Sequence, residues 1–415
     1  MMSHNTLISE LETWMLREAV SDPDIVRLFG ALCMRLHGIG IPVERAALTW
    51  PTLHPEFQAE QIYWKMGAEI ELFQYRHDGL VSGVFEASPI HHVLVNRLRT
   101  LRRRLTGTEA MVDFPVLVEL AADGYTDYLV VAAELAIAKV LEFRGGAVGV
   151  MASWATKRSG GFSSEDIAAL MRIQRVFTVA CHASIQSRVM VNLAQVYLGR
   201  TASRKVLSGT VQRGDGDVIR AVVWYSDLRG STRLSNAMAP QDYLQLLRSY
   251  YDCTAQPVMD EGGEVFEFIG DAVLAIFPIP EGEAGAEQMR AATRAMERAL
   301  VLREAAMADR EGRGLPGEIR FSVAMTVGEM MFGNIGVPER LTFSCIGRVV
   351  NMVARLDELS RDIGRAVLVT REMAEAEPEH WVPIGTHALR DFDEPVELMA
   401  RACDRDAFVP LAKSA

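Results

Sequence analysis

Three segments in the C-terminal half of the chain carry residue types that suit metal and phosphate chemistry. In the first, Asp227 follows the apolar run 221–225 at the end of a predicted strand. A turn at Gly230 then leads to the hydroxyl residues Ser231 and Thr232. A carboxylate in this position can bind a hard cation such as Mg²⁺. Backbone N–H groups at the start of the next helix can bind phosphate oxygens.

The other two segments add a second carboxylate and a polar pair. Asp271 lies in a Gly-Asp turn between two strand-like runs, and Asn351 and Arg355 are four residues apart. Residues at that spacing project from one face of a helix. Taken singly, each segment has a simpler interpretation, because an aspartate after a strand more often forms a turn and a polar helical pair more often lies on the surface. The prediction of a site therefore depends on the segments occurring together.

The elements predicted around these segments alternate between strands and helices. A helix begins at Pro240, since proline is favoured at the first helical position. Strands are predicted at 221–225, 264–269, 272–277 and 319–327, and further helices at 286–309 and 349–359. This order indicates a ferredoxin-like α/β sandwich over residues 214–407. The whole chain is thus predicted to be α+β.

In this order, the segments resemble the class III nucleotidyl cyclase family. The matching motifs are Asp-Leu-Arg-Gly-Ser-Thr at 227–232, Phe-Ile-Gly-Asp-Ala at 268–272, Gly-Asn-Ile-Gly at 333–336 and Ile-Gly-x-x-Val-Asn-x-x-x-Arg at 346–355. The resemblance covers about residues 215–405. Ser231 departs from it, because the family usually has phenylalanine there.

The resemblance implies a role for each polar residue. Asp227, Asp271 and the Leu228 carbonyl would hold two Mg²⁺ or Mn²⁺ ions. Ions held there would lower the pKa of the ribose 3′-hydroxyl and stabilise charge on the phosphoryl groups. Asn351 would orient the ribose, and the planar guanidinium of Arg355 would stabilise the α-phosphate. The expected products are a 3′,5′-cyclic monophosphate and pyrophosphate.

The resemblance also implies a homodimer. In this family the metal-binding aspartates and the Asn/Arg pair of one site come from different subunits. This chain has each of these residues once, so we expect two sites in a homodimer and no activity from a lone catalytic domain.

Two positions bear on the choice of base. Glu267 lies four residues before Asp271, where guanylate cyclases of the family usually have Glu and adenylate cyclases Lys. An ionised carboxylate can accept hydrogen bonds from the N1–H and N2–H₂ groups of guanine, whereas adenine N1 is itself an acceptor. Ser344, seven residues before Asn351, can donate or accept and does not decide. GTP is therefore favoured, with ATP as the alternative.

The N-terminal region, residues 1–160, combines helical periodicity with strand-like runs at 45–50, 61–64, 68–75, 126–132 and 146–154. The segments 40–45 (Gly-Ile-Pro-Val-Glu-Arg) and 51–55 (Pro-Thr-Leu-His-Pro) resemble regions that precede some bacterial cyclases of this class. Those regions are similar to GAF-type sensory domains. This resemblance implies a small α+β domain that gates the cyclase in response to an unidentified small molecule or protein.

Residues 161–213 are predicted to form a long helix and a linker. Ser163 and Asp166 suit a helix start, and Gly199 suits its end. A helix of about 30 residues is long for a globular domain, which indicates a connecting or dimerising rod. An ordinary helix packed on the first domain is the alternative.

Composition and charge argue against several other classes of function. The chain has 415 residues, with 43 basic and 54 acidic side chains and a net charge of −11, which disfavours binding to nucleic acid or anionic membranes. No apolar run reaches the about 20 residues that a membrane span needs. The cysteines form no Cys-x-x-Cys pair, so neither zinc nor disulfides are predicted. We expect a cytoplasmic protein.

The one basic cluster predicts a solvated or partner-facing helix, from the spacing of Arg97, Arg99, Arg102, Arg103 and Arg104.

Two further functions fit part of the pattern. A catalytically silent nucleotide-binding module would share the fold, but all four predicted metal and catalytic side chains are present here. A diguanylate cyclase would have an acidic pair after two glycines, and here Gly262 and Gly263 precede Glu264 and Val265.

Overall fold

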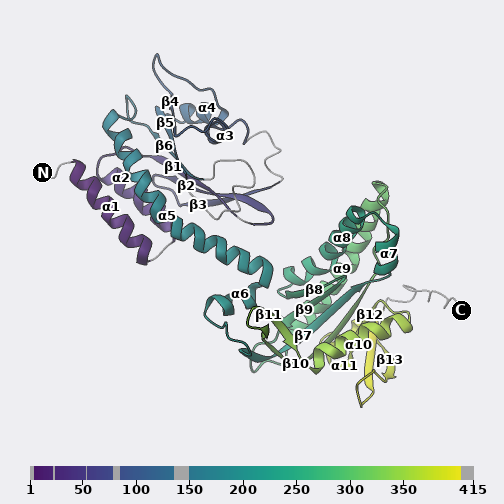
Figure 1. Cartoon of the computed structure of the whole chain (residues 1–415). Coiled ribbons are helices and arrows are strands. Elements are labelled where there is room, and N and C mark those ends of the chain that lie inside the picture. The colour runs from purple at the N-terminus through teal and green to yellow at the C-terminus, as the bar shows by residue number, and fades with distance from the viewer. Residues whose placement is uncertain (1–3, 22–23, 53, 78–84, 135–148, 403–415) are drawn as a thin grey trace. The chain divides into compact units, whose positions relative to one another are not determined.

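The computed structural model describes residues 4–21, 24–52, 54–77, 85–134 and 149–402 (Figure 1). The chain divides into two compact units, Met1–Tyr197 and Leu198–Ala415, each of mixed α and β structure. The start of the strand predicted at 146–154, residues 403–407 of the predicted catalytic domain and Cys403 lie outside the described residues. The described cysteines are buried and unpaired. Among the described helices, each is too short or too polar to cross a bilayer.

The first unit is built on an antiparallel sheet in the order β3-β2-β1-β6-β5-β4. Long strands dominate it because β-branched and aromatic residues recur in the sequence runs predicted as strands. The strand predicted at 68–75 begins later than expected, at Glu71. The strands are β1 Arg45–Pro51, β2 Phe57–Lys65, β3 Glu71–Arg76, β4 Thr100–Arg104, β5 Asp127–Glu134 and β6 Gly149–Thr156.

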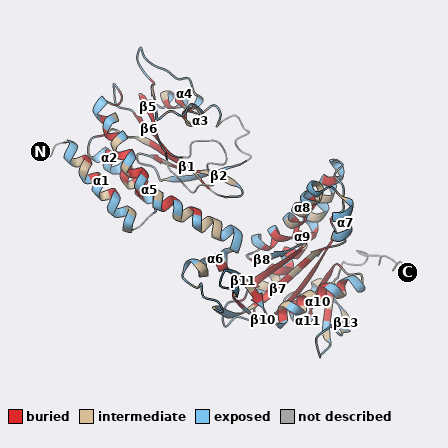
Figure 2. Ribbon diagram, viewed as in Figure 1, coloured by how far each residue is buried: buried red, intermediate tan, exposed pale blue. Residues whose placement is uncertain are grey.

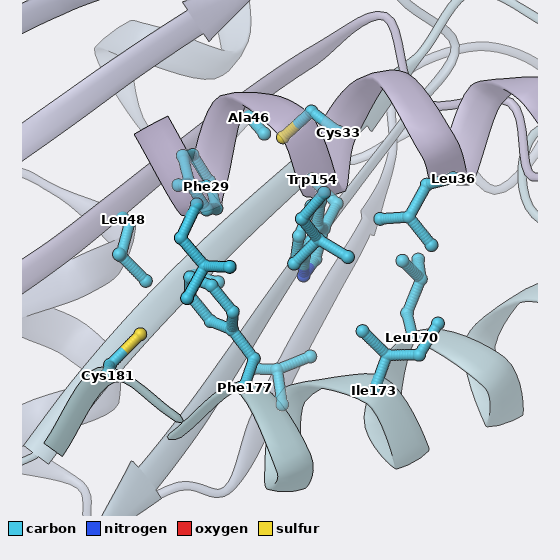
Figure 3. Close-up of a cluster of buried hydrophobic side chains, with 14 of the residues drawn as sticks. Phe29, Cys33, Leu36, Ala46, Leu48, Trp154, Leu170, Ile173, Phe177 and Cys181 are labelled. Carbon is cyan, nitrogen blue, oxygen red and sulfur yellow. The ribbon is translucent and has the colours of Figure 1, made fainter. Parts of the chain in front are cut away.

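Helices pack on both faces of this sheet. α1 (His4–Ser21), α2 (Ile25–Gly38) and α5 (Ser164–Leu198) share one core with the sheet, and Figure 3 shows part of it. α3 (Pro89–Val95) and α4 (Pro115–Ala122) contribute to a second core with β4, β5 and β6. Between Ala169 and Val189, α5 places a row of buried side chains in the first core. Over that stretch, α5 is therefore a packed helix of the first unit.

The prediction of a helix around the arginine cluster is wrong. Residues 100–104 form β4, which pairs with β5 from Thr100–Val131 to Arg104–Asp127. The side chains also have partners within the unit, since Arg102 binds Asp127 and Arg103 binds Asp113. The helical spacing was misleading because pairing with β5, a contact between residues distant in sequence, determines the local structure here.

The second unit contains a sheet in the order β13-β14-β12-β10-β7-β9-β8, with β11 paired to β10. The strands are β7 Gly216–Leu228, β8 Glu264–Ile269, β9 Ala272–Pro278, β10 Phe321–Val337, β11 Arg340–Ile346, β12 Val367–Thr370, β13 Trp381–His387 and β14 Val396–Arg401. The helices are α6 Arg200–Leu207, α7 Ser231–Ala237, α8 Pro240–Asp260, α9 Ala286–Gly312, α10 Arg348–Asp362, α11 Arg371–Ala374 and the 3₁₀ turn Pro378–His380.

The sheet has a core on each face, and β7 contributes to both; Figure 2 shows that much of the sheet is buried. Val222 and Trp224 pack with α8 and α9, whereas Val223 and Tyr225 pack on the side of α10. Side chains alternate along a strand, so Asp227 continues the series on the α10 side. This alternation determines which helix can reach the predicted metal-binding carboxylate.

Candidate active site

The structure brings the two predicted metal-binding aspartates together. Asp227 lies at the end of β7 opposite Ala272, the first residue of β9. The Leu228 N–H donates a hydrogen bond of 3.1 Å to the backbone carbonyl of Asp271. Gly270 allows the preceding turn, since its φ of 63° lies in the left-handed region. Two residues 44 positions apart in the sequence are thereby placed at one end of the sheet.

Asp227 is in an environment that disfavours its charged form. Its pKa is raised to about 6, mainly by burial and in part by the nearby carboxylates of Asp357 and Asp271. The guanidinium of Arg361 acts in the opposite direction, with Nη2 at 3.1 Å from Asp227 Oδ2. The Asp227 side chain is 16% exposed and stays open to solvent on one side.

Asp357 forms the buried part of this charge cluster. It lies on α10, and its side chain is 1% exposed. Ser322 Oγ on β10 donates a hydrogen bond to Oδ1, and Arg229 Nη2 lies 3.5 Å from the same oxygen. Arg361 Nη2 donates to Oδ2 at 2.8 Å. Buried charges are stable only when paired in this way.

The residues present fit a divalent cation. Among the described residues, no group of three or more His, Cys, Asp or Glu side chains forms a complete metal site. Asp227 and Asp271 nevertheless provide two carboxylates close enough for mutual repulsion, beside the predicted carbonyl ligand at Leu228. Mg²⁺ and Mn²⁺ prefer oxygen ligands and complete their coordination with water and substrate phosphates, so two carboxylates suffice. A bound cation would also relieve the repulsion.

The predicted phosphate-binding segment follows directly. Gly230, with φ of 73°, precedes α7, and the first residues of that helix are Ser231 and Thr232. No side chain caps this helix start. Backbone N–H groups in the first turn of a helix have no partner within the helix, so they can donate to a bound anion.

Asn351 and Arg355 are not brought to the aspartates of the same chain. Both lie on α10, where Arg361 near the C-terminal end contacts Asp227. Asn351 precedes Arg361 by ten residues, about 15 Å along the axis of an α-helix. The Arg355 guanidinium instead donates hydrogen bonds to Glu358 at 2.7 Å and Asp391 at 2.9 Å.

The two predicted base-binding positions lie on different strands, β8 and β11. Cys345 is opposite Phe332 in the β10–β11 ladder, while Ser344 is opposite Gly333. The pKa of Cys345 is raised to about 12, mainly by burial and in part by the negative charges of Glu264 and Glu267, which lie near this thiol. Neighbouring strand residues face opposite sides, so Ser344 points away from the face that carries Cys345.

The sequence analysis missed Asp357 and Arg361. Their spacing of four residues on a predicted helix indicates only a local ion pair. Nothing in the local pattern shows that Arg361 also reaches Asp227, because that contact depends on how α10 packs against β7. Proximity of Asp357 to Ser322 likewise depends on the fold.

Comparison with known proteins supports the interpretation of the C-terminal unit. Residues 218–377 match the model of the adenylate and guanylate cyclase catalytic domain. An uncharacterized protein of Mycobacterium tuberculosis is 27% identical over 233 residues, which cover 55% of this chain and 40% of the relative. One from Mycobacterium bovis is 30% identical over 214 residues, covering 48% and 36% respectively. The chain thus spans less than half the length of these relatives.

The solved structures that this chain matches include an adenylyl cyclase and a guanylyl cyclase. The adenylyl cyclase CyaB from P. aeruginosa is 22% identical, with a TM-score of 0.40, and the match covers 47% of this chain and 100% of that one. The guanylyl cyclase Cya2 is also 22% identical with a TM-score of 0.40, over 48% and 97% of the two chains. On the match over residues 218–377 and the ordered motifs that the structure carries, the C-terminal unit is a catalytic domain of the class III adenylate and guanylate cyclase family.

Proposed function

We propose that the C-terminal unit converts a nucleoside triphosphate, preferably GTP, to the 3′,5′-cyclic monophosphate and pyrophosphate. The observation that carries this proposal is the placement of Asp227 beside Asp271 at the end of the β7–β9 pair, within a matched cyclase domain. Two Mg²⁺ or Mn²⁺ ions, when bound there, would supply charge stabilisation to the phosphoryl groups and acidify the ribose 3′-hydroxyl.

The chain's own groups would bind and orient the nucleotide. The N–H groups after Gly230 would donate hydrogen bonds to phosphate oxygens. Asn351 would hold the ribose so that its 3′-oxygen is in line with the α-phosphate. Arg355 would exchange its present carboxylate partners for the α-phosphate, where negative charge spreads in the transition state.

A homodimer would complete each site. The separation of about 15 Å along α10 between Asn351 and the residue that contacts Asp227 supports this, since one chain then holds only half of each site. Mixing Asp227→Ala chains with Arg355→Ala chains tests the arrangement. Each variant alone should be inactive, and the mixture should regain about a quarter of the parental turnover through one intact site in each mixed dimer, a statistical estimate that assumes free exchange of subunits. No recovery after confirmed subunit exchange would contradict a site shared between chains.

Contacts between α6 and β8 support gating by the first unit. Directly after α5, Thr201 donates hydrogen bonds to Glu264 from its N–H, at 2.7 Å, and from Oγ1. Glu264 begins β8, the strand that carries Glu267 and leads to Asp271. Ala202 and Lys205 further fix α6, through burial and an ion pair with Asp217 respectively. A displacement of α5 would thus reach the strand that precedes a metal-binding aspartate.

Turnover of the full chain with ATP, GTP, CTP and UTP, each with Mn²⁺ and with Mg²⁺, tests the activity. Products are identified by mass spectrometry. Cyclic GMP as the main product would support the proposal and the role of Glu267, whose carboxylate suits guanine. Cyclic AMP would keep the reaction and assign the chain to the alternative, an adenylate cyclase. No cyclic product from a folded dimer under any condition would contradict the proposed reaction.

A further inference from the structure

Arg361 joins two carboxylates of different character. Its Nη2 lies 3.1 Å from Asp227 Oδ2 and 2.8 Å from Asp357 Oδ2. Asp227 is one of the two predicted metal-binding aspartates, whereas Asp357 is buried and also has Ser322 and Arg229 as partners. The arginine therefore occupies the position of a counter-ion for the carboxylate that a metal would use.

The geometry allows Arg361 to leave without disrupting the core. Its side chain is 50% exposed and lies in the last turn of α10, so it can extend into solvent. Asp357 would keep the Ser322 hydroxyl and the Arg229 guanidinium, which approach Oδ1 rather than Oδ2. Asp227, in contrast, would lose its ion pair with Arg361. A cation can therefore replace Arg361 at Asp227, while Asp357 keeps enough partners to remain in place.

We propose that Arg361 is a positioning residue that neutralises Asp227 when no metal is bound and is displaced when a divalent cation binds. The proposal rests on the proposed function, since it assigns Asp227 to metal binding. Displacement means that metal must compete with an ion pair within the same chain, so Arg361 lowers the resting metal affinity. Metal then binds most effectively together with a nucleotide, whose phosphates add ligands that compensate for breaking the pair. The residue would thereby discourage metal binding without substrate.

A purely structural role makes a different prediction. If Arg361 only stabilised α10 through Asp357, its removal would lower stability and leave the metal affinity of Asp227 unchanged. If it oriented Asp227 for metal, its removal would weaken metal binding. Only a counter-ion that competes with metal gives tighter binding when it is removed.

Binding of Mn²⁺ to the full chain, without nucleotide, tests this through the electron paramagnetic resonance signal of free Mn²⁺. Arg361→Gln removes the charge and keeps much of the side-chain length. The expected change is about tenfold tighter binding, because Mn²⁺ then no longer competes with the ion pair between Arg361 and Asp227, and a tenfold change corresponds to about 1.4 kcal/mol. Arg361→Lys keeps the charge and should stay within about threefold of the parent. Arg313→Gln is the matched control, because Arg313 is an exposed arginine paired four residues away with Asp309.

Three outcomes would overturn the proposal: unchanged affinity in Arg361→Gln, weaker binding, or binding still undetectable when the competing charge is gone. Asp271→Asn in the Arg361→Gln background should abolish the tightened binding, which locates it at this site. Tighter Mn²⁺ binding in a chain that forms no cyclic nucleotide would support the counter-ion role and contradict the proposed function. Cyclic nucleotide formation with unchanged Mn²⁺ affinity would do the reverse.

Discussion

Both units bury acidic side chains, but the two units differ in the hydrogen-bond donors and charges that surround these carboxylates. In the first unit Asp127 is fully buried, and Arg102 donates to both of its oxygens at distances from 2.6 to 3.2 Å. The Phe162 N–H adds a further hydrogen bond of 2.9 Å. A Cβ at position 161 would collide with the Asp127 side chain, so Gly161 is needed for this approach. Both carboxylate oxygens of Asp127 therefore accept hydrogen bonds from groups of the same unit.

In the second unit Asp227 shares the Arg361 guanidinium with Asp357, and the carboxylates of both Asp357 and Asp271 repel it. The contrast shows how to separate structural from functional acids. A buried carboxylate that is paired within its unit belongs to the folded structure, whereas a partly exposed carboxylate flanked by two others is suited to an external cation.

The largest expected effect is on turnover. Asp227→Asn should lower cyclic nucleotide formation by at least about 10³-fold, because a metal-binding carboxylate accounts for several kcal/mol of charge stabilisation. Melting in EDTA at pH 7 should show a second unit at least as stable as the parent. Quantification of the product checks the loss of turnover, and melting of the same preparation checks the stability. Turnover within tenfold of the parent would contradict the assignment of Asp227.

Next in size is a loss of stability in the first unit. Asp127→Ala leaves Arg102 partly buried without its carboxylate, which should cost about 3–5 kcal/mol. Asp113→Ala is the matched control, because Asp113 is a more exposed partner of Arg103 and should cost less than about 1 kcal/mol. Hydrogen exchange followed by mass spectrometry reports on each unit separately. Equal losses of stability in the two variants would mean that the buried Asp127 contributes no more to stability than the more exposed Asp113.

The smallest effect is a difference in pH dependence between the units. The pKa of Asp227, raised to about 6 mainly by burial, means that the folded state holds its proton over a range where the unfolded chain, near 3.8, has released it. Its contribution to stability therefore falls as pH rises from about 4 to 6, by about 1–3 kcal/mol. Asp227→Asn should remove this fall and leave the second unit more stable than the parent at pH 7.

Asp166 should behave in the opposite way. Burial alone would raise its pKa, but hydrogen bonds from Ser163 and the Arg158 guanidinium bring it below the ordinary value. Its contribution is thus present above about pH 4 and is lost as pH falls further. Hydrogen exchange in EDTA from pH 3 to 8 would reveal both trends. The same slope in both units would contradict the distinction between the two kinds of acid.

Local patterns in the sequence predicted most elements of the second unit. The strand at 264–269 and the helix that begins at Pro240 are confirmed, because a clear apolar period and a proline or glycine punctuate each of them. The long helix is confirmed within two residues at each end, and Ser163 Oγ accepts the Asp166 N–H at 3.1 Å as its capping pattern indicated. The helix predicted around the arginine cluster is wrong, because pairing with β5, which is distant in sequence, determines the structure there.

The candidate site was only partly accessible from the sequence. Ordered motifs named Asp227 and Asp271, and the β7–β9 ladder explains why residues so far apart meet. Arg361 could not be found in this way, since its contact with Asp227 depends on the packing of α10. Which face of β11 lies toward Glu267 also depends on how that strand packs, so the sequence alone could not show that Cys345 rather than Ser344 lies on that face.

The two glycines that join α8 to β8 have a consequence for how such motifs are recognised. Gly262 has φ of 84°, and a Cβ at Gly263 would lie 2.7 Å from Val258 and 2.8 Å from Phe277. One glycine meets a backbone requirement and the other a packing requirement, so neither depends on the reaction. The same compact connection between a helix and a strand would favour two glycines in an enzyme of any chemistry. The residues that distinguish one reaction from another must then be those that follow the glycines, here Glu264 and Val265, where crowding does not exclude side chains.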